Sequence, residues 1–115
     1  MKVLQDFDFT QRVSEKAGEL DAVVWAESNG WLVRKMQYAG RHSCPDRLFA
    51  GYGQLFLIEM KKRGKTPSRD GKLSEGQRLE FERYAAVGVT VHVFYTGEDA
   101  IAFLKTKMPA PGLLV

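Results

Sequence analysis

The hydrophobic and polar positions of the chain form a series of helix-like and strand-like segments. In residues 14–29, apolar side chains recur every three or four positions, which predicts a helix, and Asn29-Gly30 supplies its stop signal. Residues 31–38 then have the pattern of a strand with apolar side chains on both faces. The expected inner side of the helix consists of Ala17, Leu20 and Val24, extended by Ala22, Val23 and Trp25.

The middle of the chain predicts a hairpin. After a polar loop at residues 39–45, two short strands at 46–50 and 54–61 flank Gly51-Tyr52-Gly53, whose glycines suit a tight turn. Residues 64–72 have loop composition. This part of the chain therefore supplies two neighbouring antiparallel strands.

The second half predicts a helix, a strand and a last short helix. The helix begins at Ser74 and runs to about Val87, and Gly88 ends it. Residues 89–95 are the most strand-like run, and residues 98–107 predict the last helix. The order αβββαβ, followed by one more helix, predicts an α/β fold with a small mixed sheet. The expected inner face of the Ser74 helix consists of Leu79, Phe81, Tyr84 and Ala85.

Length and composition place these elements in a single globular domain. The 115 residues are 44% apolar and 27% charged, with a net charge of +3, which permits an anionic partner without requiring one. We expect an N-terminal arm at residues 1–13, one domain at 14–107 and a C-terminal tail at 108–115. The lone Cys44 cannot form an intrachain disulfide, and no apolar run approaches the ~20 residues of a membrane span. A cytoplasmic, intracellular protein with no membrane partner is the expectation.

The hairpin brings charged side chains together. If Tyr52-Gly53 is a two-residue loop, Gly51 faces Gln54, and Asp46 lies directly opposite Glu59. Opposed side chains of an antiparallel pair lie on the same face of the sheet. Strand alternation then adds Lys61 to that face.

This arrangement has two interpretations. Two carboxylates held close together repel unless a proton or a cation lies between them, and a hard cation such as Mg²⁺ with oxygen ligands resolves the conflict. Alternatively, Asp46, Lys61 and Glu59 form a salt-bridge cluster on a solvated face. The hairpin geometry alone leaves both open.

The motif itself resembles a nuclease signature. Pro45-Asp46 followed by Glu59-Met60-Lys61 is similar to the PD-(D/E)xK motif, and the surrounding sequence resembles the VRR-NUC family, the virus-type replication-repair nucleases. Ser43 departs from the family pattern, in which the position two before the proline is often glycine. The resemblance also includes Glu19, Gly30-Trp31, Lys35, Arg47, Gln77 and the segment from Gly88 to Val93.

The resemblance implies roles for individual residues. The family has a restriction-endonuclease-like core in which Asp46 and Glu59, helped by the main-chain carbonyl of Met60, would hold Mg²⁺, with Mn²⁺ as a substitute. Lys61 would orient or deprotonate the attacking water. Glu19 would add a further metal ligand, with Glu15, one helical turn earlier, as the alternative.

Gln77 has two interpretations. Ser74 and Gln77 have the spacing of a capping box, in which each side chain satisfies a main-chain amide of the other residue. The family pattern instead brings Gln77 to the metal site or the scissile phosphate. His42 and His92 do not suit a zinc site, and we expect His92 to be packed on its strand.

The resemblance implies a Mg²⁺-dependent, structure-specific DNA endonuclease that acts on branched DNA such as Holliday junctions, from a bacterium or a phage. Shape-reading by a small domain favours a homodimer. The apolar side chains available for its interface are Phe7, Phe9, Leu113, Leu114 and Val115, and the alternative is that they dock onto their own domain. The alternatives are a flap or single-strand nuclease acting as a monomer, and a nucleic-acid-binding module without catalysis. Expected contacts to DNA phosphates come from Lys35, Arg41, Lys62, Arg63, Lys65 and Lys72.

Overall fold

The computed structural model describes residues 19–66, 68 and 70–110 of the 115. The predicted arm at residues 1–13, the start of the first helix at 14–18, and residues 111–115 of the tail lie outside the described residues. The first helix is described over residues 19–28. The other elements are β1 (Leu32–Lys35), β2 (Arg47–Gly51), β3 (Gln54–Met60), α2 (Glu75–Ala86), β4 (Val91–Phe94) and α3 (Gly97–Lys105).

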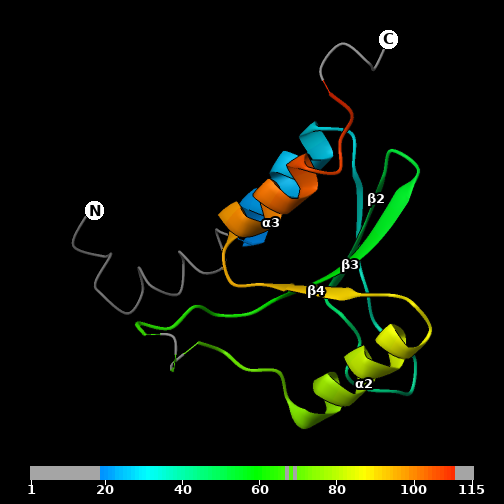
Figure 1. Ribbon diagram of the computed structural model, residues 1–115, viewed down its shortest axis with the longest axis vertical. Helices are drawn as coiled ribbons and strands as arrows, with labels where there is room; N and C mark the ends of the chain where they lie inside the picture. Colours follow the sequence, from blue (N-terminus) through cyan, green and yellow to red (C-terminus); the bar gives the residue numbers. More distant parts are fainter. Residues whose placement is uncertain (1–18, 67, 69, 111–115) are drawn as a thin grey trace.

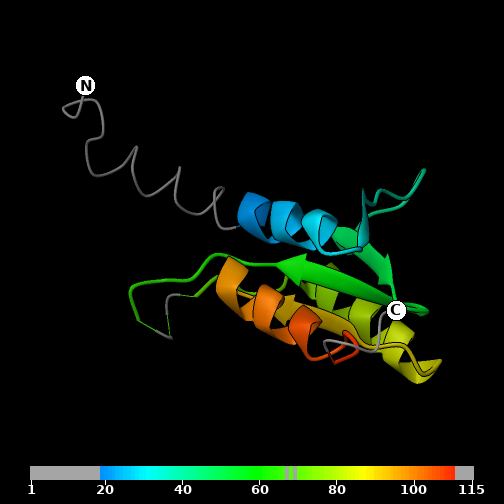
Figure 2. The ribbon, with the colours of Figure 1, turned by 90° about the horizontal axis from the view of Figure 1, so that it is seen from above.

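The elements form a mixed α/β fold, as predicted. The strands form one sheet in the order β1-β2-β3-β4, antiparallel except for the parallel pair of β3 and β4. The first helix and α3 lie side by side against one face of the sheet, and α2 lies against the other (Figures 1 and 2). This arrangement is consistent with a restriction-endonuclease-like core.

The predicted hairpin register is confirmed. Gly51 pairs with Gln54, and the ladder continues to Arg47 opposite Ile58. Tyr52 and Gly53 both have positive φ, at 54° and 76°, as a tight hairpin turn with the twist of the strands requires. The β2–β3 pairing therefore ends at Arg47, the residue that directly follows Asp46.

The hydrophobic core lies between the sheet and the pair of helices. Val33, Phe49 and Ile58 project from three neighbouring strands to the same side and pack with Leu104 of α3. Trp31, which is 3% exposed, belongs to the same core.

The expected inner side of the first helix is wrong in part. Ala22 and Ala26 are buried, whereas Leu20 and Val24 are 49% and 61% exposed. Positions 22 and 24 lie about 200° apart around a helix, so burying one exposes the other. The small alanine side chains allow the helix to lie close to the sheet, and that close packing selects the face.

The expected inner face of α2 also needs correction. Phe81 is buried as expected, but Leu79 is 38% exposed and Ala85 is exposed, while the charged Glu80 is only 8% exposed. Glu80 is buried because side chains from the β1–β2 connection bind its carboxylate, a long-range contact that hydrophobic periodicity does not report.

Within the described residues, no helix is both long and apolar enough to cross a bilayer.

Candidate active site

Asp46 and Glu59 meet one position beyond Arg47 and Ile58, the last residue pair between β2 and β3. The Asp46 amide donates to Glu59 Oε1 at 3.2 Å, and the Met60 amide donates to Asp46 Oδ2 at 3.1 Å. Each carboxylate thus accepts a main-chain hydrogen bond from the other strand. The side chains of this pair continue the hairpin register by one step, as the sequence predicts.

Glu59 is the most deeply buried charged residue of the site, with 3% of its surface exposed. Burial, followed by the nearby charge of Asp46, raises the pKa of its carboxyl group, and Lys61 acts in the opposite direction. The Lys61 Nζ lies 3.5 Å from Glu59 Oε2. Lys61 therefore lies on the Glu59 side of the strand, as alternation predicts.

Gln77 caps α2 and also contacts Glu59. Its main-chain amide donates to Ser74 Oγ at 3.1 Å, and its Oε1 accepts from the Ser74 amide at 3.0 Å, which completes the capping box of α2. Its Nε2 donates to Glu59 Oε2 at 3.0 Å. The start of α2 is thus tied directly to the buried carboxylate.

Glu19 does not join this pair. Its Oε2 accepts hydrogen bonds from Arg47 Nη2 at 2.9 Å and Arg47 Nε at 3.2 Å. Arg47 follows Asp46 and pairs with Ile58, so its side chain projects to the helix-pair face of the sheet, away from Glu59. In the part of the chain that the structure describes, no three His, Cys, Asp or Glu residues are grouped closely enough to hold a metal ion. Glu15 lies outside the described residues.

The paired carboxylates suit a hard divalent cation. Asp46 accepts the Met60 amide on Oδ2, which leaves Oδ1 available, and its negative charge contributes to the raised pKa of Glu59. Oxygen donors of this kind are those that Mg²⁺ prefers, and Mg²⁺ commonly uses one or two protein carboxylates together with water. The residues present therefore fit such an ion.

The predicted phosphate-binding residues lie at the end of β1, in the β1–β2 connection and in the segment between β3 and α2. Lys35 ends β1, and the segment between β3 and α2 carries Lys62, Arg63, Lys65 and Lys72 away from the sheet (Figure 1). The ends of this segment are held together by a hydrogen bond from the Gly71 amide to the Lys62 carbonyl oxygen at 2.6 Å. Arg63 lies 3.7 Å from Asp99, and its guanidinium lies over the ring of Tyr95.

Arg41 belongs to a polar cluster that the sequence did not reveal. The Tyr38 hydroxyl donates to Glu80 Oε2 at 2.6 Å and lies 2.8 Å from the Tyr84 hydroxyl. Arg41 Nη2 lies 2.9 Å from Glu80 Oε1, and Arg83 adds a weaker contact at 3.3 Å. The position of Glu80, three residues after Gln77 and so on the same side of the helix, is the sequence signal that could have indicated it.

Ser43 has the backbone conformation of a glycine. Its φ is 72°, in the left-handed region that side chains other than those of Gly, Asn and Asp rarely adopt. Serine, where the family often has glycine, therefore adopts the left-handed conformation here at a cost in backbone strain.

His92 is packed as expected. Its ring lies among Phe56, Phe94 and Phe103, and burial lowers the pKa of its imidazole, with a smaller effect from Lys107. His42 lies exposed in the β1–β2 connection.

Fold and site together define a class. A mixed sheet covered by helices on both faces is consistent with a restriction-endonuclease-like core, and Asp46 lies beside Glu59 and Lys61 on its neighbouring strands. The chain is similar to a solved structure described as a VRR_NUC domain. That structure matches with a TM-score of 0.69 and 28% identity, over 83% of this chain and 98% of the other.

This match confirms the resemblance to the VRR-NUC family. The similarity implies a nuclease of the PD-(D/E)xK type, in a family that is typically metal-dependent. No protein-family model and no curated protein matches the chain.

Proposed function

We propose that this protein is a Mg²⁺-dependent DNA endonuclease that hydrolyses phosphodiester bonds at the Asp46–Glu59 pair. The observation that carries the proposal is the buried Glu59 carboxylate, held beside Asp46 and contacted by Lys61 and Gln77. An ion pair with Lys61 needs only one acid, whereas two neighbouring carboxylates are a common ligand set for Mg²⁺. The match to a VRR_NUC domain supports the same conclusion.

The chain's own residues have distinct roles in this proposal. The Asp46 amide and Gln77 fix the orientation of the Glu59 carboxylate. Lys61, 3.5 Å from Glu59, orients or deprotonates the attacking water and stabilises negative charge on the phosphate oxygens. When bound, Mg²⁺ or its substitute Mn²⁺ supplies Lewis-acid stabilisation of the developing charge. The Met60 carbonyl, adjacent to Glu59 in the chain, is the proposed third protein ligand.

The proposed substrate is branched DNA, with a four-way junction as the leading case. A single nuclease domain at residues 14–107 reads DNA shape more readily than base sequence, and two symmetric cuts favour a homodimer. Lys35, Arg41 and the basic segment after β3 supply the phosphate contacts. A flap or single-strand nuclease acting as a monomer is the alternative within the same chemistry.

The test of the proposed function is cleavage of junction, flap and linear duplex DNA with and without Mg²⁺. Asp46→Asn and Glu59→Gln should each lower the Mg²⁺-dependent rate by at least ~10²-fold, because each removes a charged oxygen ligand from the transition state. DNA binding should persist in both variants. Wild-type rates in either variant would show that the site is wrongly assigned, and binding without cleavage by the wild type would favour a non-catalytic module.

Neighbouring lysines provide a matched control in the same assay. Lys61→Ala should reduce the cleavage rate far more than DNA affinity, because Lys61 lies beside Glu59. Lys62→Ala, at an exposed position, should mainly weaken binding and lower the salt slope of log K by about 0.9. Equal effects of the two substitutions on both quantities would contradict the assigned roles.

A further inference from the structure

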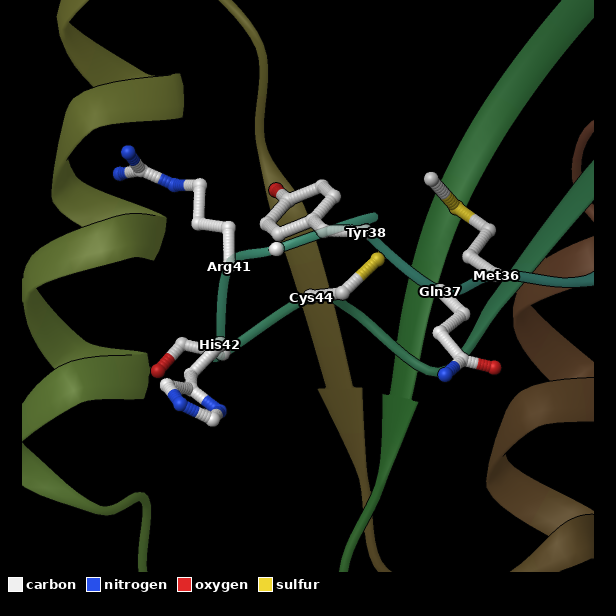
Figure 3. A pocket seen from close by; sticks show the side chains of 8 residues that line it. Met36, Gln37, Tyr38, Arg41, His42 and Cys44 are labelled. Atoms are coloured by element: carbon white, nitrogen blue, oxygen red, sulfur yellow. The ribbon is translucent and has the colours of Figure 1, made fainter.

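The connection between β1 and β2, which leads into Asp46, borders an open hollow. The Met36 amide donates to the Asp46 carbonyl oxygen at 2.9 Å and closes the base of this connection, residues 36–46, which we call the 36–46 loop. The hollow has a volume of about 570 Å³, within the ~300–1,000 Å³ range of small-ligand sites (Figure 3). Its lining consists of Met36, Gln37, Tyr38, Gly40, Arg41, His42, Ser43 and Cys44.

The walls of the hollow are held in place by α2. Tyr38 and Arg41 both bind Glu80, which is 8% exposed. Ser43 lies against the first turn of the helix, since a Cβ added to Gly76 would stand 2.6 Å from Ser43 Oγ. The hollow is thus fixed at several points along the 36–46 loop, which lowers the entropy lost when a ligand binds.

The lining combines apolar and hydrogen-bonding groups. Figure 3 shows Tyr38 and Met36, which offer an aromatic ring and a thioether, along one stretch of the loop, with Gln37 and His42 projecting on other sides of it. Gln37 and His42 are exposed, and the structure gives their side chains no hydrogen bond or ion pair within the described residues. A planar ligand with hydrogen-bonding edges suits this combination: rings stack on aromatic faces, and amides and imidazoles bind the edges.

We propose that this hollow binds the nucleobase of a nucleotide adjacent to the scissile phosphate, with Gln37 and His42 contacting the base. The proposal rests on the proposed nuclease function. Because the loop ends at Asp46, a phosphate at the carboxylate pair brings a neighbouring base within reach of the hollow. The contact stabilises a nucleotide that has left its base stack, which is easiest at a branch point.

The test uses the full-length protein and DNA junctions in which one abasic residue is moved along the strand around the mapped cut. For wild-type protein, an abasic residue at one flanking position should slow cleavage about tenfold, as expected for loss of one protein–base contact. The variant Gln37→Ala/His42→Ala should cut intact DNA about tenfold more slowly. It should not slow further on the DNA that lacks that base.

Thr90→Ala, at an exposed position between α2 and β4, is the control and should retain the wild-type dependence on the abasic position. If the abasic residue slows the double variant by the same factor as it slows the wild type, the two effects are independent and the proposal is overturned. A double variant that cuts intact DNA at the wild-type rate would also overturn it. Affinity measured by fluorescence anisotropy in Ca²⁺ gives the same comparison without cleavage. Base-dependent binding without any Mg²⁺-dependent cleavage would support base binding in the hollow and refute the proposed nuclease function. Mg²⁺-dependent cleavage without base dependence would support the nuclease function and refute base binding in the hollow.

Discussion

Several interactions shift the pKa of the Glu59 carboxyl group in opposite directions. The carboxylate is buried beside Asp46, which disfavours ionisation, yet Lys61 and the hydrogen bond from the Asp46 amide favour the charged form. Burial dominates, so the pKa of Glu59 is raised. A bound divalent cation would reverse that balance, which is why such a pair is maintained in a metal site.

The raised pKa predicts how stability changes with pH without divalent metal. Since the folded Glu59 holds its proton to higher pH than the unfolded chain, its contribution to stability is complete at low pH and is lost as pH rises through the folded pKa. Asp46→Asn removes one cause of the raised pKa and keeps an acceptor for the Met60 amide. The variant should therefore gain on the order of 1 kcal/mol relative to the wild type at pH 7.

Urea unfolding from pH 3 to pH 8 in EDTA measures this difference, which should vanish below the ordinary pKa of glutamate, 4.5. Asp21→Asn, at an exposed position of the first helix, is the control and should show no such profile. A gain that persists unchanged at pH 3 would contradict the electrostatic explanation. Added Mg²⁺ should stabilise the wild type more than Asp46→Asn.

At the scale of elements, α2 holds two parts of the site together. Gln77 in its first turn binds Glu59, and Glu80 one turn later binds Tyr38 and Arg41 of the 36–46 loop. Residues three apart project to the same side of a helix, so a single helix face contacts both the buried carboxylate and the loop that leads into Asp46. The hairpin register places Asp46 beside Glu59, and α2 holds both the Glu59 carboxylate and the loop that leads into Asp46.

Removing the hydroxyl that joins loop and helix should test this function of α2. Tyr38→Phe deletes a donor to Glu80 and should lower the free energy of unfolding by about 1 kcal/mol. It should also raise the Mg²⁺ concentration needed for half-maximal cleavage, because Asp46 becomes less firmly placed. Tyr84→Phe, which spares the bond from Tyr38 to Glu80, should have a smaller effect on both. A Tyr38→Phe variant that is destabilised but has an unchanged Mg²⁺ requirement would show that the contact serves stability alone.

At the scale of the whole molecule, α2 leaves part of its sheet face uncovered. Leu32 of β1 pairs with Ala50 of β2, which pairs with Leu55 of β3, and the two leucines are 50% and 56% exposed. Cross-strand neighbours share a face, so these residues form an apolar row across three strands. Val87, at the end of α2, is 76% exposed. The predicted interface residues Phe7, Phe9, Leu113, Leu114 and Val115 lie outside the described residues.

The proposed homodimer predicts a measurable mass. Sedimentation equilibrium at micromolar concentration without DNA should give twice the monomer mass, since a two-fold partner doubles the basic surface and supplies the second cut. If the apolar row contributes to a two-fold interface, Leu55→Lys should shift the protein to monomer, whereas Lys105→Ala on α3 should not. A wild-type monomer that still makes paired cuts in junction DNA would favour the flap-nuclease alternative.

The sequence alone predicted the features that depend on residues close together in the chain. The order of elements, the Ser74–Gln77 capping box and the register that places Asp46 beside Glu59 all depend on residues close in the chain or on a two-residue turn. The motif in that register also carried the resemblance to the VRR-NUC family. Such features are predictable because turn and cap geometry are set by a few neighbouring residues.

The tertiary structure decided the features that depend on contacts between distant segments. It placed Glu19 on Arg47, and it buried Glu80 under Tyr38 and Arg41. It also chose Ala22 and Ala26 over the larger Leu20 and Val24 as the buried side of the first helix. Hydrophobic periodicity cannot give these outcomes, because it reports which faces could be buried, whereas close packing and the pairing of buried charges determine which faces are.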